Sequence, residues 1–130
     1  GIGLKNGAIA TSISHDSHNI IIIGENDEDM LVALRQIEII GGGIVLAKNG
    51  KALDYIKLPY AGLMSDKPIA YVARKMEELL KIAKDEIKVR LDDPFMTLSF
   101  MSLAVIPELK IVDRGLVDVN EFKLVDLFVY

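Results

Sequence analysis

Both histidines of the 130-residue chain lie in one polar stretch, "HDSHN", which separates two apolar runs. Histidine titrates near neutral pH and binds metal ions, and a neighbouring carboxylate can orient its ring. In a continuing strand His15 and His18 would point to opposite faces, whereas Asp16 and His18 would share a face. The spacing therefore favours a carboxylate–imidazole pair over a two-histidine metal site.

The same stretch has a structural interpretation, in which it only turns the chain from one strand into the next. Asp, Ser and Asn side chains commonly hydrogen-bond the nearby backbone and so stabilise turns. No third metal ligand and no partner for a nucleophile stands nearby in the sequence. The residues alone leave both interpretations open, and the candidate functional residues are His15, Asp16, His18 and Asn19.

Two other stretches suggest ligand binding but are better explained by structure. The stretch "GENDEDM" holds acids and an amide, yet it lacks the alternate ligand spacing and the central glycine of a calcium loop. Helix capping by Asn26 explains it. The glycines at 41–43 follow a predicted helix, whereas a phosphate-binding loop needs glycines that lead into one. A zinc signature of the cytidine-deaminase type is excluded, because the chain has no cysteine.

The first half of the chain predicts two strands, a helix and a hairpin. Residues 8–15 alternate, with small side chains on one face. Residues 20–23 form a β-branched run that we expect to be a strand buried on both faces. The helix that follows Asn26 ends at Gly41. Asn49-Gly50 predicts a two-residue hairpin, because both of its positions need a positive φ.

The second half predicts a longer helix over residues 66–89, with Ser65 as its N-cap and Pro68 in its first turn. Its apolar stripe is expected to pack on the sheet and consists of Ile69, Val72, Met76, Leu79, Ala83 and Ile87.

The last third favours a short helix after Asp93 over a strand, followed by short strands at residues 109–112, 116–119 and 124–129. The predicted fold is α+β, with a mixed or antiparallel sheet and two principal helices in a single compact domain over residues 1–130.

Composition excludes several partners. The net charge is −4 and no cluster of lysine and arginine occurs, so we expect neither nucleic acid nor a membrane surface as a partner. No apolar run approaches the roughly 20 residues that a membrane-spanning helix needs. The absence of cysteine is compatible with a cytoplasmic location. The chain opens on Gly1 without an initiator methionine, so we expect a piece of a longer protein.

Specific wording runs along almost the whole chain, in the segments "GAIATSISHDSHNIIIIG", "NDEDM", "GGGIVLAKNGK", "LPYAGLMSD", "DPFMTLSFMSL" and "VIPELKIVDRGLVDV". In wording and order these segments resemble the C-terminal domain of the adenine deaminase family, a microbial branch related to the amidohydrolase superfamily. The resemblance implies hydrolysis of adenine to hypoxanthine and ammonia in purine salvage and catabolism. It also implies manganese or iron in an N-terminal (β/α) barrel with a His-x-His motif.

That His-x-His motif is absent from this chain. We therefore expect no cofactor here, no deaminase activity from this domain alone, and the barrel of the same enzyme as its partner, within a possible homo-oligomer. Under this resemblance His15, Asp16, His18 and Asn19 are hypothesised to border the cleft between barrel and C-terminal domain. Two other classes stay open: a stand-alone domain that binds a purine or another small ligand and regulates a separate barrel, and a structural domain that mediates oligomer contacts.

Overall fold

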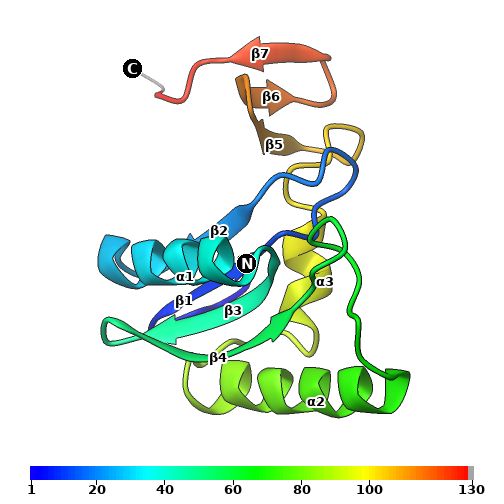
Figure 1. Cartoon of the computed structure of the whole chain (residues 1–130). Helices are drawn as coiled ribbons and strands as arrows, with labels where there is room; N and C mark the ends of the chain where they lie inside the picture. The colour runs from blue at the N-terminus through cyan, green and yellow to red at the C-terminus, as the bar shows by residue number, and fades with distance from the viewer. Residues whose placement is uncertain (129–130) are drawn as a thin grey trace.

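The computed structural model describes residues 1–128 and contains, within them, two antiparallel sheets and three helices (Figure 1). This confirms the α+β prediction, with antiparallel sheets. The elements in chain order are β1 (Ala8–Thr11), β2 (Ile21–Gly24), α1 (Asp27–Ile40), β3 (Gly43–Lys48), β4 (Lys51–Lys57), α2 (Ile69–Asp85), α3 (Pro94–Ser99), β5 (Leu109–Val112), β6 (Gly115–Asp118) and β7 (Lys123–Val125). Within residues 1–128 no helix is both long and apolar enough to cross a membrane.

The main sheet has the strand order β2-β1-β3-β4 and carries helices on both faces (Figure 1). Side chains alternate between the faces with the period of two that a strand imposes. On one face the small Ala8 and Ala10 let α1 pack closely through Ala33 and Ile37. The opposite face packs against α2 and α3, through a core that includes Ile9, Ile44, Leu46, Leu79, Phe95 and Leu98.

Helix α1 begins and ends as predicted. The Asn26 side chain accepts a hydrogen bond from the backbone N–H of Asp29 at 2.8 Å, and Gly41 ends the helix with a φ of 76°. The Asp29 carboxylate is buried and accepts hydrogen bonds from the Asn26 amide at 2.9 Å and the Gly50 N–H at 2.8 Å. The polar "GENDEDM" stretch therefore caps α1 and ties it to the β3–β4 turn.

The pKa of Asp29 lies below its ordinary value. Burial raises this pKa, but hydrogen bonds from the Gly50 N–H, the Asn26 amide and the Asn49 N–H favour the charged carboxylate and outweigh it. The turn that supplies two of these donors is the predicted hairpin, with φ of 53° at Asn49 and 71° at Gly50.

The glycines after α1 let their backbone lie very close to the backbone of Gly62 and Ile56. A Cβ on Gly42 would collide with the backbone of Gly62, and one on Gly43 with the carbonyl of Ile56. The buried Ser12 hydroxyl fixes this junction, because it donates to the Gly62 carbonyl at 2.6 Å and accepts from the Gly43 N–H at 2.8 Å. The loop after β4 is thereby held against the end of β1.

Helix α2 is shorter than predicted at both ends. It begins at Ile69 because Pro68 disfavours a helical backbone at the residue before it. Ser65 accepts from the N–H of Lys67 at 3.1 Å and does not cap the helix. The helix ends at Asp85, and Lys88 adopts a left-handed φ of 60°.

The expected apolar stripe of α2 is confirmed in its middle and wrong at its start. Leu79 and Ala83 are buried, and Ile87 is buried beyond the helix end. Ile69 is 86% exposed, because the first residue of the helix lies past the edge of the core.

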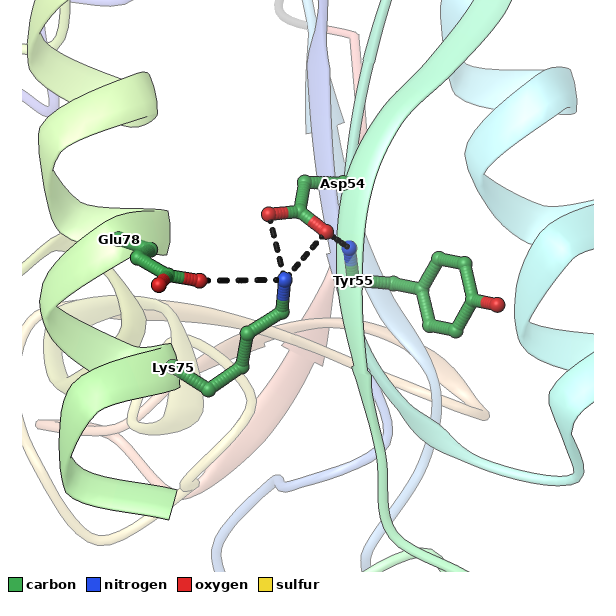
Figure 2. A network of polar contacts seen from close by, with 4 residues as sticks. All are labelled: Asp54, Tyr55, Lys75 and Glu78. Carbon is green, nitrogen blue, oxygen red and sulfur yellow. Dashed lines mark hydrogen bonds and ion pairs between the residues drawn. The ribbon is translucent and has the colours of Figure 1, made fainter. Parts of the chain in front are cut away.

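An ionic network fastens α2 to the outer strand β4 (Figure 2). The Lys75 ammonium donates to both carboxylate oxygens of Asp54 at 2.7 Å and to Glu78 at 3.4 Å. Burial lowers the pKa of Lys75, but the hydrogen bond and charge of Asp54, helped by Glu78, raise it above its ordinary value. The carboxylate of Asp54 also accepts from the N–H of Tyr55 at 2.8 Å.

Two predicted strands differ from the observed ones. The strand expected over residues 8–15 ends at Thr11, where the chain leaves the sheet. Strand β2 is half-buried and not buried on both faces, because it lies at the edge of the main sheet. The outer edge of β2 therefore carries backbone groups that no strand of the main sheet pairs.

The C-terminal third forms the short helix α3, as favoured, and a small sheet of order β5-β6-β7. Asp93 caps α3 by accepting from the N–H of Met96 at 2.9 Å. Strand β5 matches its prediction and β6 is shifted by one residue. Of the strand predicted at 124–129, the structure forms β7 at Lys123–Val125, and position 129 lies outside the described residues.

Candidate functional site

The "HDSHN" stretch forms a turn between β1 and β2 and not a continuing strand. The N–H of His18 donates to the carbonyl of Ser14 at 2.8 Å, and His18 adopts a left-handed φ of 52°. The chain therefore reverses between the two histidines. Their rings lie 6.4 Å apart between centroids, so the opposite-face arrangement that a continuing strand would give does not occur.

The turn is anchored on helix α3 and the residues that follow it. The N–H of His15 donates to the carbonyl of Ser99 at 2.8 Å, and its ring stacks on Phe100 at 4.9 Å. Beside it the buried hydroxyls of Ser14 and Ser102 lie 2.6 Å apart and hydrogen-bond each other. Sequence reasoning missed this role of "DPFMTLSFMSL", although serines within so apolar a run were the available signal.

The predicted carboxylate–imidazole pair is not formed in this structure. Within residues 1–128 no hydrogen bond or ion pair joins Asp16 to His18, and both side chains are exposed. Asn19 follows them and is half-buried. Within residues 1–128 the structure thus brings the rings of His15 and His18 together and forms no hydrogen bond or ion pair between Asp16 and either histidine. It supports a turn that is held in place by its backbone contacts.

His15 lines a small hollow at the end of the main sheet. The hollow measures about 170 Å³, and its polar lining groups are Thr11, His15, Asp93 and Ser99. It adjoins a second hollow of about 350 Å³ along α2, which shares three of its lining residues, Ile13, Ile44 and Met76. Together they make a mostly apolar groove with a few polar groups in each hollow, Ser65 and Lys67 among them in the larger one, and this is the general form of a small-molecule site.

Most polar groups of the smaller hollow already serve the local backbone. Thr11 accepts from the N–H of Ile13, Asp93 caps α3, and Ser99 donates to the carbonyl of Met96 at 2.7 Å. Within residues 1–128 the imidazole of His15 makes ring contacts with Phe100 and His18 and no hydrogen bond. Among the residues that line this hollow, it is the side chain best able to hydrogen-bond an incoming group.

Residues 1–128 do not form a site for a catalytic metal. No group of three or more histidines and carboxylates is placed to hold an ion in the part of the chain that the structure describes. Protein sites for zinc, manganese or iron need at least three such ligands. The arrangement can orient or hydrogen-bond a ligand, and it offers no means to activate a metal-bound water.

Comparison with known proteins gives the family. Residues 1–123 match the family described as "Adenine deaminase C-terminal domain". The chain is 53% identical over 128 residues to an adenine deaminase of Desulfatibacillum aliphaticivorans, which covers 98% of this chain and 22% of that protein. It is 49% identical over 130 residues to an adenine deaminase of Thermosipho africanus, with 99% and 22% covered.

A third relative, an adenine deaminase of Clostridium acetobutylicum, is 48% identical over 122 residues, which cover 93% of this chain and 21% of the relative. The chain spans about a fifth of the length of the curated relatives it matches. The resemblance found in the sequence is thus confirmed, and the chain belongs to the adenine deaminase C-terminal domain family.

Proposed function

We propose that this chain serves as the C-terminal domain of an adenine deaminase, an enzyme that hydrolyses adenine to hypoxanthine and ammonia. The observation that carries the proposal is the similarity to adenine deaminases over 98% of the chain at 53% identity. We take residues 1–130 as one domain of that enzyme. We further propose a cytoplasmic location and leave a homo-oligomer as a prediction.

The metal-dependent chemistry is assigned to the rest of the enzyme. Metal-assisted hydrolysis requires ions that lower the pKa of a bound water. The family resemblance implies manganese or iron for this role, in a barrel outside this chain. Since the residues here do not fit such a site, we assign no catalytic step to them. The domain alone is expected to be inactive toward adenine.

We propose that the turn at residues 15–19 borders the cleft that faces the barrel. There His15, Asp16, His18 and Asn19 would hydrogen-bond the purine or help to exclude water from it. Three observations support this: the turn is anchored by the Ser14–Ser102 pair, its histidines are exposed, and His15 lines a hollow. A polar side chain can position a substrate when its backbone is fixed by the fold and the side chain itself is exposed to the ligand.

A chimera tests the proposal directly. The matching C-terminal segment of the Desulfatibacillum adenine deaminase is replaced by this chain, and formation of hypoxanthine and ammonia from adenine is measured. We expect the chimera to deaminate adenine, whereas the enzyme without its segment and this chain alone should not. A folded, metal-loaded chimera without activity would contradict the proposal, as would deamination by this chain alone.

A further inference from the structure

The small sheet of β5, β6 and β7 has almost no core of its own. Between positions 101 and 128, seven apolar side chains are more than half exposed: Val105, Leu109, Ile111, Phe122, Leu124, Leu127 and Phe128. Between positions 101 and 128, Val119 is the only apolar side chain that is buried. In Figure 1 the sheet stands apart from the two layers that cover the main sheet. A sheet of three short strands needs an apolar face packed against something to be stable.

A large hollow opens where the small sheet meets the main sheet. It measures about 530 Å³ and is lined by the isoleucines at 20–23, by Leu98 of α3 and Met101 just after it, and by Leu109, Ile111 and Leu116. By strand register Leu109, Ile111 and Leu116 lie on the same face of the small sheet. We call this lined space the apolar hollow.

The chemistry of the apolar hollow indicates a peptide and not a purine as its occupant. Every lining side chain is a leucine, isoleucine or methionine, so no polar side chain could pair with the ring nitrogens of a base. Small-molecule sites place a few polar groups for that purpose. An apolar protein segment needs no such groups, and β2, an edge strand, offers backbone groups beside the hollow.

We propose that the apolar hollow receives an apolar segment from the remaining part of the adenine deaminase polypeptide, and that this contact docks the small sheet onto the catalytic part. This proposal rests on the proposed function. About four-fifths of the length of each matched relative lies outside the region that this chain covers, so such an enzyme holds a large partner in the same polypeptide. Exposed apolar patches of this kind mark interaction surfaces.

Amide hydrogen exchange of this chain alone and within the chimera tests the docking. In the chain alone, the amides of β5, β6 and β7 should exchange rapidly, because few side chains cover them. In the chimera their exchange should slow by about tenfold or more. Unchanged exchange in a folded chimera would overturn the proposal. Protection that rises with the concentration of the chain alone would also overturn it, since a second copy would then fill the hollow.

A matched pair of substitutions locates the contact. Ile111→Asp puts a charge into the apolar hollow, and Ile39→Asp puts the same charge on the exposed surface of α1, where the isoleucine is 77% exposed. Both variants of the chain alone should keep its thermal midpoint. In the chimera Ile111→Asp should restore rapid exchange of the small sheet, and Ile39→Asp should leave it slow. Equal behaviour of the two variants would overturn the proposal.

Failure of the docking and failure of the function give different results. An active chimera with an unprotected small sheet would overturn the docking and leave the proposed function standing. An inactive chimera with a protected small sheet would support the docking and count against the proposed function. A chimera that is folded, inactive and unprotected would count against both.

Discussion

The main sheet and the small sheet are both antiparallel, yet they differ in what covers them. Helix α1 covers one face of the main sheet, and α2 with α3 covers the other, so that Ile9 and Leu46 are fully buried. Within residues 1–128 no helix packs closely on the small sheet, which faces Leu98 of α3 only across the apolar hollow, and Leu109 and Ile111 remain exposed. The same alternating pattern thus forms a strand in both places, but only one of them contributes to a core.

The difference shows which part of the chain is stable by itself. Burial of apolar surface is the main favourable term in folding, and the main sheet has nearly all of it. A strand pattern specifies which side chains share a face, and it does not specify what will cover that face. The small sheet is therefore the region whose stability should depend most on a partner.

The largest effect is expected from Leu79→Ala in α2. Leu79 is fully buried in the core between α2 and the main sheet, so its truncation should lower the free energy of unfolding by about 2–5 kcal/mol. The matched control is Leu124→Ala in β7. The Leu124 side chain is 56% exposed, so this change should lower the free energy of unfolding by less than about 0.5 kcal/mol. Urea unfolding of both variants measures the contrast. Similar losses at the two sites would mean that the small sheet has a core.

A smaller effect is expected from Asp29→Ala at the start of α1. The change leaves the N–H of Gly50 without its acceptor and should cost about 1–3 kcal/mol. Because the pKa of Asp29 is lowered by folding, its contribution is complete above the ordinary pKa of 3.8 and is lost as the pH falls through the folded value. The difference in stability between wild type and variant should therefore shrink below about pH 4. A difference that stays constant down to about pH 2 would contradict this.

Lys75→Met should lower the free energy of unfolding by about 1 kcal/mol. The change removes the cation between β4 and α2 but keeps the apolar part of the side chain. Since the pKa of Lys75 is raised in the folded chain, its contribution is present below the ordinary value of 10.5 and is lost as the pH rises through the folded value. Lys67→Met is the control, because the Lys67–Asp66 pair lies on the surface at 3.3 Å. Thermal unfolding at neutral and strongly alkaline pH measures both, and equal losses would mean that the network adds nothing.

Local chemistry made most of the fold predictable. The cap at Asn26, the stop at Gly41 and the turn at Asn49-Gly50 each depend on one or two residues, and each was predicted correctly. The two differences have different causes. The later start of α2 is a local effect, because Pro68 disfavours a helical backbone at the residue before it. The edge position of β2 depends on tertiary context, because an isoleucine run carries no sign of whether its strand lies at an edge or in the interior.

The sequence could point to the segment of the candidate site, but it could not predict how that segment is folded. The unusual polarity of "HDSHN" singled out the stretch, and its Asp, Ser and Asn are compatible with a turn, but the residues alone left a turn and a carboxylate–imidazole pair both open. The anchor could not be predicted, since Ser14 and Ser102 are 88 residues apart in the chain. The approach of the two imidazoles likewise depends on a backbone reversal that the spacing alone does not fix.

The smallest effect on stability is expected in the turn itself. Asp16→Ala and His18→Ala remove exposed side chains and should each lower the free energy of unfolding by less than about 0.5 kcal/mol. Because no hydrogen bond joins the two side chains within the described residues, the double variant should show the sum of the two small effects. A double variant no worse than the worse single one would show that the two residues act as a pair in solution.

The same variants in the chimera separate a functional turn from a structural one. If either side chain hydrogen-bonds the purine or a developing charge, its removal should lower kcat/KM by about a hundredfold or more, with the fold nearly intact. If both only shape the turn, kcat/KM of the folded enzyme should not change.

Phe100→Leu sharpens the contrast, because it removes the ring on which His15 stacks and leaves the imidazole in place. A positioning role for the turn predicts a raised KM for adenine in that variant, since a less fixed His15 would meet the ligand less often in the required orientation. Unchanged kinetics in all three variants would assign the whole stretch to structure.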